Sequence, residues 1–368
     1  MKKKVLVISY DLIKKVNIRV YEELSKYNNL NFFCLRPKNH NGKKIFSDHK
    51  KKNKFLNIIE TNVFFNHKRL MFFEGTSQHI KNVRPSHIIL HSDPVSLQTL
   101  WIIILSFFFK FKICCYSNEN KVLGNLDFRN FFRTIILIIL NFFIKFRIDN
   151  ILCISKQIKK NYNFLGYKRK TILIPLGFDE KIFYLRKKKK NKSFNISYFG
   201  RICYQKGLHT LISAITKLDF DFKLNIDIDQ IDDIDYFKDL INQCKQNLIF
   251  KKIKFIKCDH FTISKHMSVS DLIVVPSIYQ EQYGRVIQEG VACGSLVIGS
   301  NAGAIPEIIC DKDLIFEKEN YKALATLITK LNNKLFYKNK FKRLYNLIMK
   351  KRSLSNQVNI LIKSEIFK

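Results

Sequence analysis

The chain lacks paired cysteines, long apolar runs and a balance of acidic with basic residues. Its nine cysteines are dispersed without C-x-x-C or metal-type spacing, which argues against a disulfide framework and a zinc site and indicates reduced thiols in the cytosol. The N-terminal apolar run, Val5 to Ile8, is too short for a signal sequence and is instead typical of a first strand. With 46% hydrophobic residues in regular runs, the sequence predicts a globular chain.

Acidic residues are scarce, since 30 Asp and Glu stand against 65 Lys and Arg and give a net charge of +35. Residues 1–190 hold 38 basic and 12 acidic residues, or +26, whereas residues 191–368 hold 27 and 18, or +9. This excess suits an anionic membrane surface or acceptor. Drift of the whole composition toward Lys, Asn, Ile and Phe is the alternative, although drift does not predict the asymmetry. A nucleic-acid partner is not expected, because no recognition motif for one is present.

Short apolar runs alternate with helical stretches through both halves of the chain. A length of 368 residues is enough for two domains, and this alternation is typical of α/β proteins with parallel, doubly wound sheets. Strands are expected at Val5–Ser9, Asn31–Leu35, Phe55–Glu60, His87–His91, Phe111–Tyr116, Asn150–Ile154 and Thr171–Ile174. In the second half they are expected at Phe194–Phe199, Lys223–Asp227, Lys251–Ile256, Leu272–Val275 and Leu296–Gly299, and helical segments are expected after Leu314–Phe316.

A basic run, Arg186 to Lys190, separates the two alternating patterns. Its low apolar content and self-repulsion are typical of a linker. The sequence thus predicts an N-terminal domain over residues 1–185, a linker over 186–193, a C-terminal domain over 194–345 and a C-terminal helical segment over 346–368.

Two expected helices, Leu100–Lys112 and Phe131–Arg147, are unusually apolar and basic. The longest uncharged run in the second, Thr134 to Ile144, is well short of the roughly 18–20 residues that cross a bilayer, so neither is expected to span a membrane. Because Phe131–Arg147 carries three basic residues and no acid, its apolar face could lie in a membrane interface. A helix buried between the sheet and a neighbour fits the pattern equally well.

Glycine is also scarce, yet seven of the twelve glycines lie between Gly200 and Gly303, which indicates that backbone comes close to something there. The first cluster, residues 198–207, ends a strand and begins a helix. Such a turn offers free N–H groups and a helix N-terminus to an anion, and Arg201 and Lys206 add two cations that suit a diphosphate. A structural turn with surface cations is the alternative.

A second glycine-bearing stretch runs from Glu281 to Glu307. It predicts a loop, a helix over Tyr283–Cys293, a strand and another loop, Ser300–Gly303. Two strand-to-helix loops side by side make a site for a polar ligand. Glu281 and Glu289 would reach this site from different heights, and paired carboxylates suit sugar hydroxyls. Two stray acids on a solvated helix are the alternative.

This stretch resembles the C-terminal signature of the retaining, family-4-type glycosyltransferases of the GT-B fold, the glycosyl transferases of group 1. The signature is a glutamate, seven residues, a second glutamate, Ala-Cys-Gly, a Val/Ile strand and Gly-x-x-Pro-Glu, and every landmark is present. The loop of Arg201 and Lys206 resembles the family's Gly-Arg…Lys-Gly element, and Ile154-Ser155 and Ile174 to Asp179 match further landmarks.

The resemblance spans about Leu152 to Leu335 and, more faintly, the N-terminal half. It implies an α/β protein of the GT-B fold, with two doubly wound, Rossmann-like domains facing a cleft. Closure of the cleft would assemble the site. In the family, the C-terminal tail crosses back onto the first domain.

The resemblance also implies roles for individual residues. Arg201 and Lys206 would bind the donor diphosphate, Glu289 the nucleotide ribose, and Glu281 the hydroxyls of the transferred sugar near the reacting carbon. The catalytic set is thus Glu281, Arg201 and Lys206. The other donor-binding residues would be Gly200, Tyr283, Gly284, Arg285, Ser300 and Gly303.

The N-terminal half departs from the family pattern. The first strand ends in Ser9-Tyr10-Asp11 without the usual glycine, and Ser117-Asn118-Glu119-Asn120 stands where many relatives carry a histidine. Glu119, Asn120 and His91, which ends the preceding strand, are candidates for acceptor or sugar contacts. No nucleophile is identified, in keeping with the family's reaction, in which the departing phosphate is thought to deprotonate the acceptor.

The sequence therefore predicts a retaining glycosyltransferase that moves a hexose-type sugar from a nucleotide diphosphate sugar to a cell-surface glycan or lipid-linked acceptor, as in polysaccharide or lipopolysaccharide biosynthesis. No cofactor and no metal are expected, because Arg201 and Lys206 supply positive charge, and the Asp-x-Asp motif at Asp227 lies outside the expected site. The cytoplasm, or the inner face of its membrane, is the expected location. A nucleotide-sugar epimerase of the same fold and a non-catalytic glycan- or membrane-binding protein are the alternatives.

Overall fold

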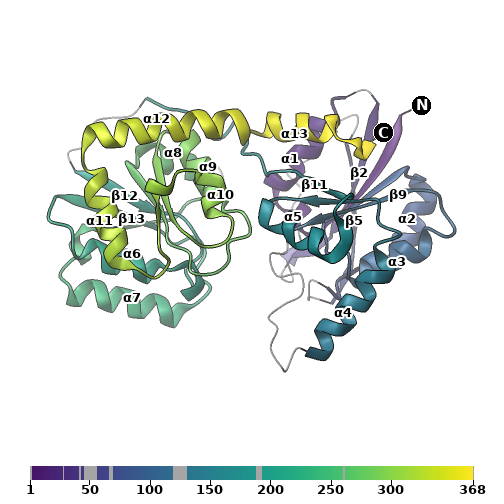
Figure 1. The fold of residues 1–368 in the computed structure, drawn as a ribbon, viewed down its shortest axis with the longest axis horizontal. Coiled ribbons are helices and arrows are strands. Elements are labelled where there is room, and N and C mark those ends of the chain that lie inside the picture. The colour runs from purple at the N-terminus through teal and green to yellow at the C-terminus, as the bar shows by residue number, and fades with distance from the viewer. Residues whose placement is uncertain are drawn as a thin grey trace. The chain divides into compact units, whose positions relative to one another are not determined.

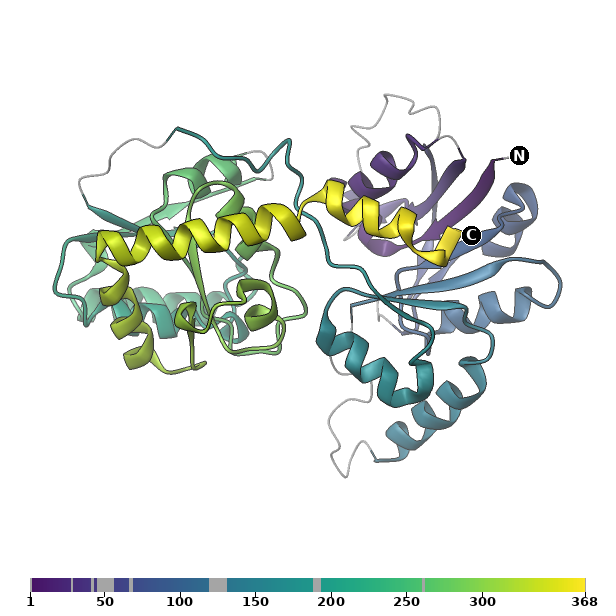
Figure 2. The ribbon, with the colours of Figure 1, turned by 45° about the horizontal axis from the view of Figure 1, so that its top comes forward.

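The computed structural model describes residues 2–27, 29–40, 43–44, 56–65, 69–118, 131–187, 193–259 and 262–367. The chain forms two compact units (Figure 1, Figure 2). Unit 1 comprises Met1–Pro175 and Ser355–Lys368, and unit 2 comprises Leu176–Leu354.

Unit 1 is built on a seven-stranded sheet in the order β11-β10-β9-β8-β1-β2-β5, and all of its neighbouring strands are parallel. The central strand β1 is an apolar run buried at Val5 to Ile8, as expected where helices cover both faces of a parallel sheet. The strands are β1 (Lys3–Ile8), β2 (Leu30–Pro37), β5 (Leu56–Thr61), β8 (His87–Leu90), β9 (Lys112–Ser117), β10 (Asn150–Cys153) and β11 (Thr171–Leu173).

The chain order reverses between β1 and β8, so that successive crossovers run outward from this point in opposite directions. Because such crossovers are right-handed, the helices of the two halves cover opposite faces of the sheet. The helices of unit 1 are α1 (Lys15–Leu24), α2 (Thr76–Val83), α3 (Leu97–Leu105), α4 (Phe131–Ile144), α5 (Lys156–Tyr162) and α13 (Leu354–Lys363), with the short turns η1 (Tyr10–Ile13), η3 (Asn163–Tyr167) and η7 (Glu365–Phe367).

Unit 2 repeats this plan with six parallel strands in the order β14-β13-β12-β15-β16-β17. Here the chain order reverses between β12 and β15, which makes the carboxyl ends of these two strands the expected ligand position. The strands are β12 (Phe194–Tyr198), β13 (Phe222–Asp227), β14 (Ile253–Ile256), β15 (Leu272–Val275), β16 (Leu296–Ser300) and β17 (Ile315–Phe316). The helices are α6 (Leu208–Ile215), α7 (Ile234–Gln246), α8 (Ile263–Val269), α9 (Arg285–Ala292), α10 (Ile305–Ile309), α11 (Tyr321–Leu331) and α12 (Lys334–Lys351), with the turns η4 (Tyr204–Lys206), η5 (Phe250–Lys252) and η6 (Lys312–Leu314).

The predicted α/β class with two doubly wound sheets is confirmed. The predicted helix over Leu100–Lys112 is wrong at its end, because α3 stops at Leu105 and Lys112 opens β9, where its N–H donates to the Ser86 carbonyl (2.9 Å). Sheet pairing therefore overrides the apolar pattern. Two short antiparallel strand pairs, β3 (Asn39–His40) with β4 (Lys43–Lys44) and β6 (Val63–Phe64) with β7 (Phe72–Phe73), were not predicted.

The units divide at Pro175, earlier than the boundary predicted at residue 185. The segment after Pro175 is bonded to unit 2, since Phe178 exchanges main-chain hydrogen bonds with the Arg352 carbonyl and the Leu354 N–H (both 2.9 Å). Likewise, the Arg186 guanidinium donates to the Ser264 carbonyl (3.1 Å). The C-terminal segment is two helices, α12 and α13, and residues from Ser355 onward belong to unit 1.

Candidate functional site

The loops that follow β12 and β15 are joined through their main chains at the reversal point of unit 2. The N–H groups of Ile278 and Tyr279, after β15, both donate to the Gln205 carbonyl, after β12 (3.0 and 3.2 Å). Gly207 closes the first loop with φ +69, and a Cβ on it would lie 2.0 Å from the Pro276 carbonyl oxygen. Only glycine fits this turn, and it sets the loop against the end of β15.

This junction brings Lys206 onto Glu281. The Lys206 Nζ lies 2.6 Å from a Glu281 carboxylate oxygen, which also accepts a hydrogen bond from the Ser277 hydroxyl (3.0 Å). The two side chains are 23% and 16% exposed. A pair that is partly buried is screened less than a surface pair, yet it is still open to a ligand.

The second glycine-bearing loop, Ser300–Gly303, packs against the main chain of Glu281. Gly303 has φ +59, and a Cβ on it would lie 2.3 Å from the Glu281 carbonyl oxygen, which accepts the Ala304 N–H (2.8 Å). Ser300 is buried and donates its hydroxyl to the Ser277 carbonyl (2.5 Å). Both residues therefore fix the backbone that carries Glu281, and the Ser300 hydroxyl is engaged within the protein.

Arg201 has a different partner from Lys206. Its guanidinium lies 2.5 Å from a carboxylate oxygen of Asp232, and the Arg201 side chain is 52% exposed. Its carbonyl accepts the Tyr198 hydroxyl (2.7 Å), and a Cβ on the preceding Gly200 would lie 3.2 Å from that same hydroxyl. The structure thus joins Lys206 to Glu281 and holds Arg201 at Asp232.

Glu289 lies on α9, whose first residue, Arg285, follows Gly284 in the left-handed conformation (φ 80). The Glu289 side chain is buried, and burial raises the pKa of its carboxyl to about 7, while the positive charge of Arg285 acts in the opposite direction. Within the described parts of the chain, no group donates a hydrogen bond to this carboxyl. It is therefore a buried acceptor that a ligand hydroxyl could satisfy.

Tyr283 turns its side chain into unit 2. The hydroxyl donates to the Leu176 carbonyl (2.7 Å) and accepts from the Arg352 guanidinium (3.1 Å), which also bonds the Glu307 carbonyl (3.2 Å). Burial raises the pKa of Tyr283 to about 12. This ring braces the loop of Glu281 against the end of α12, so only the main chain of Tyr283 remains to face a ligand.

In unit 1, His91 follows β8 at the carboxyl edge of the sheet. Its Nε2 lies 2.5 Å from the Tyr21 hydroxyl, and its ring stacks on that of Tyr116 (centroids 4.7 Å apart, planes at 12°). The ring is thus held on two sides at the reversal point of this sheet. Glu119 and Asn120, the other two candidates in this half, lie outside the described residues.

A polar cluster next to His91 was missed by sequence reasoning. One carboxylate oxygen of Asp93 accepts the Ser117 hydroxyl (2.9 Å) and lies 3.1 Å from the Tyr162 hydroxyl. The other lies 3.8 Å from the Arg69 Nε. The only sequence signal is an acid two residues beyond the end of an expected strand, because its partners come from distant segments.

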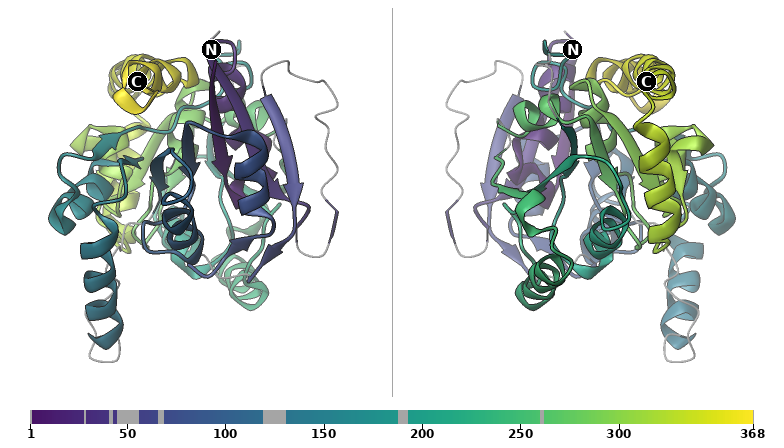
Figure 3. Two further views of the ribbon diagram at one scale, coloured as in Figure 1. Left: turned by 90° about the vertical axis from the view of Figure 1, so that its right-hand side faces the viewer. Right: turned by 90° about the vertical axis from the view of Figure 1, so that its left-hand side faces the viewer.

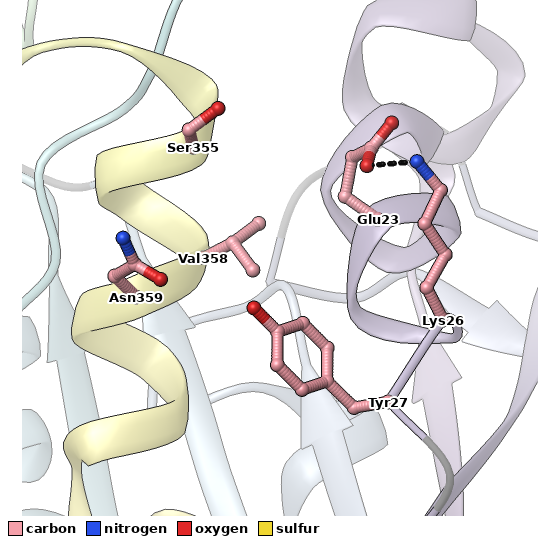
Figure 4. Close-up of a pocket in the computed structure, with 6 residues that line it drawn as sticks. All are labelled: Glu23, Lys26, Tyr27, Ser355, Val358 and Asn359. Carbon is pink, nitrogen blue, oxygen red and sulfur yellow. Dashed lines mark hydrogen bonds and ion pairs between the residues drawn. The ribbon is translucent and has the colours of Figure 1, made fainter.

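A small pocket of unit 1, of about 250 Å³, is lined by residues of α1 and α13 (Figure 4). The Tyr27 hydroxyl points toward α13, and Lys26 pairs with Glu23 on the other side. Because α1 leads from the carboxyl end of β1 to the amino end of β2, this pocket lies at the edge of the sheet opposite His91. The lining residues are Glu23, Lys26, Tyr27, Ser355, Val358 and Asn359.

Across the described ranges, no three His, Cys, Asp or Glu side chains are grouped so as to hold a metal ion. The Asp-x-Asp acid Asp227 instead accepts the N–H groups of Asp229 (3.2 Å) and Cys258 (3.1 Å). It therefore fixes two loop turns.

Unit 2 has a doubly wound parallel sheet of the Rossmann-like class, with a paired cation and carboxylate at its reversal point. Residues 180–346 match the family described as glycosyl transferases group 1. This match confirms the resemblance that the sequence signature indicates for this part of the chain. An uncharacterized glycosyltransferase of Methanocaldococcus jannaschii is 32% identical over 189 residues, which cover 50% of this chain and 50% of that protein.

Solved structures extend the likeness to the whole chain. Sucrose-phosphate synthase from Thermosynechococcus elongatus aligns with a TM-score of 0.76 at 16% identity, covering 98% of each chain. Anabaena HepE in complex with UDP and glucose aligns with a TM-score of 0.74 at 15% identity, again over 98% of each chain. At these identities the likeness concerns the fold, and it confirms the GT-B class. The chain spans about half the length of the M. jannaschii relatives that it matches.

Proposed function

We propose that the protein is a retaining glycosyltransferase that moves a hexose-type sugar from a nucleoside diphosphate sugar to a glycan or lipid-linked acceptor. The observation that carries this proposal is the ion pair of Lys206 and Glu281 (2.6 Å) at the reversal point of unit 2. A cation can bind the phosphates of such a donor, and a carboxylate beside it can accept hydrogen bonds from the hydroxyls of the attached sugar.

Each side chain then has one task. Lys206, with Arg201 on the same loop, neutralises the charge that develops on the departing diphosphate. Glu281 accepts hydrogen bonds from hydroxyls of the transferred sugar. Glu289 accepts them from the ribose, in keeping with its burial and its lack of a donor among the described groups.

The same assignment makes a metal dispensable in the proposal, because side-chain cations provide the positive charge at the leaving group. The acceptor side is assigned to the carboxyl edge of the unit 1 sheet, where His91 is held by Tyr21 and Tyr116. Retention with a departing phosphate as the base requires no protein nucleophile, and the proposed residue set contains none.

The first test is a thermal-shift panel of UDP, GDP, ADP and their sugars on the wild type and on Glu289→Gln. Because HepE is a structural relative with UDP and glucose bound, UDP and UDP-glucose are the first ligands to try. Stabilisation of the wild type by one base, weakened in the variant, supports a donor site and identifies the base. No response to any nucleotide by a folded wild type contradicts it.

A second step separates transfer from the alternatives. With the binding sugar nucleotide and a mixture of glycan and lipid-linked acceptors, a transferase releases nucleoside diphosphate in proportion to a product whose anomeric configuration equals that of the donor. An epimerase changes the sugar without an acceptor, and a binding protein changes nothing.

A further inference from the structure

Helix α4 presents an apolar surface to solvent. Six residues of α4 and one residue just after it are large, hydrophobic and exposed, and Phe143 is 66% exposed. Figure 3 shows α4 extending away from the sheet of unit 1. The exposed residues are Ile135, Ile136, Ile138, Ile139, Phe142, Phe143 and Phe146.

The buried side of α4 is narrow and partly polar. Leu137, Asn141 and Ile144 are buried and recur at helical spacing. The Asn141 side chain accepts the Tyr167 hydroxyl (3.1 Å), and the Lys170 Nζ holds the Lys145 carbonyl beyond the helix end (2.6 Å). An ordinary surface helix buries its apolar side and exposes its polar side, whereas α4 also exposes large apolar side chains on the side that faces solvent. The alternative of a fully buried helix is therefore wrong.

The end of α3 adds to the same surface. The Arg147 guanidinium, just after α4, lies 3.9 Å from the centre of the Phe107 ring, and Phe107 and Phe108 are 68% and 77% exposed. Phe107, Phe108, the exposed Ile104, the six exposed residues of α4 and Phe146 are here called the α4 face.

Basic side chains border the α4 face. The Lys145 Nζ lies 4.4 Å from the centre of the Phe142 ring, and Arg147 covers Phe107. Lys110 and Lys112 follow α3 and are exposed. Residues 97–112 and 131–147 contain no acidic residue. The surface thus combines exposed aromatic and aliphatic groups with a positive rim.

We propose that the α4 face docks on a lipid bilayer that carries anionic headgroups, with α4 lying in the plane of the interface. Apolar side chains enter the boundary of headgroups and acyl chains, while the cations of the rim meet phosphates. With 14 residues, α4 is about 21 Å long. No helix among the described residues is long and apolar enough to cross a membrane, so the attachment is to one surface.

Charge decides between a bilayer and a second copy of this chain. A symmetric dimer through the α4 face would bring the same patch of both copies together, and Lys145 and Arg147 would then face equally basic partners. Anionic lipid removes that repulsion and complements the rim. This inference does not depend on the proposed function, because none of its residues belongs to the donor site.

The test is co-sedimentation of the full chain with vesicles of phosphatidylcholine, alone or mixed with phosphatidylglycerol. We expect binding to the mixed vesicles that weakens with salt, and a loss of about tenfold or more in Phe142→Ser/Phe143→Ser. The control is Leu248→Ser/Leu335→Ser, which removes two exposed leucines of unit 2 and should bind as the wild type does. Far-UV circular dichroism and melting curves show whether each variant is folded.

A Lys145→Gln/Arg147→Gln variant should lose the preference for anionic over neutral vesicles. The proposal is overturned if the wild type binds neither kind of vesicle, or if the double Phe variant binds as the wild type does. Sedimentation velocity tests whether the α4 face instead joins two copies of the chain. A wild-type dimer that Phe142→Ser/Phe143→Ser dissociates, without vesicle binding, would assign the α4 face to a second copy.

Discussion

The Lys206 ammonium group lies 2.6 Å from the Glu281 carboxylate although 75 residues separate them in the chain. The contact depends on two glycines that allow close backbone approach, Gly207 at Pro276 and Gly303 at Glu281. In this structure the Glu281 carboxylate pairs with the Lys206 ammonium group. A bound diphosphate would share or take over that cation, and this consequence can be measured.

Glu281→Gln should separate binding of the sugar from binding of the diphosphate. We expect transfer to fall by about 100-fold or more, because a contact made to the reacting sugar is lost. Affinity for the nucleoside diphosphate without sugar should stay equal or rise, since Lys206 no longer pairs with a carboxylate. Isothermal titration calorimetry with the sugar nucleotide and with the nucleoside diphosphate measures the two affinities. Equal losses for both would contradict the assignment of Glu281 to the sugar.

Gly303→Ala should destabilise the protein by more than the cost of placing an alanine in a left-handed conformation. A left-handed alanine costs about 1–2 kcal/mol, and here the added methyl would also lie 2.3 Å from the Glu281 carbonyl oxygen. Gly75→Ala is the control, with a similar φ (+64) and no atom nearer than 3.6 Å. Urea unfolding should show the larger loss of stability for Gly303→Ala, and only this variant should lose donor affinity. Equal losses of stability in the two variants would show that the backbone shifts to avoid the clash with the Glu281 carbonyl oxygen, and would contradict this prediction.

Glu289 should make stability depend on pH. Burial raises its pKa from 4.5 to about 7, so the folded state holds this proton more tightly than the unfolded state does. The resulting stabilisation is fully present below pH 4.5 and is lost as pH rises through about 7, a difference of about 3 kcal/mol. Glu289→Gln should therefore be more stable than the wild type at pH 8, and by a smaller margin at pH 5. Urea unfolding at both pH values measures the difference in stability between variant and wild type. The same difference at pH 5 and pH 8 would contradict the raised pKa of Glu289.

The same carboxyl predicts proton release on nucleotide binding. Ribose hydroxyls donate to the ionised form and favour it, so the wild type should release protons when it binds nucleotide near pH 7. Calorimetry in buffers of different ionisation enthalpy measures this number. Glu289→Gln should release fewer protons, and an unchanged number would place the ribose elsewhere.

The strands of both sheets could be predicted from sequence because parallel strands buried on both faces are short apolar runs, as in Val5 to Ile8. The two-residue strands such as Val63–Phe64 could not, since so short a segment has no periodicity. Helix α3 was overextended because Phe107 and Phe108 continue an apolar pattern beyond Leu105, although both are exposed. Their apolar character belongs to the surface of the α4 face.

For the site, glycine spacing located the loops, but the partners of their side chains depend on tertiary structure. Nothing in the sequence indicates that Arg201 pairs with Asp232, or that Ser300 donates to the Ser277 carbonyl. The Asp93 cluster was missed for the same reason, because Ser117 and Tyr162 reach it from 24 and 69 residues away.

The most direct test of the donor site is the affinity of Lys206→Met for the nucleoside diphosphate of the responding base, with the nucleoside as a second ligand. Lys340→Met is the matched control, because Lys340 is also a partly buried lysine of unit 2 paired with an acid, Asp311 at 3.0 Å. We predict that Lys206→Met loses about tenfold or more in affinity for the nucleoside diphosphate and none for the nucleoside, while Lys340→Met binds both as the wild type does. Equal diphosphate affinity in all three proteins would contradict it.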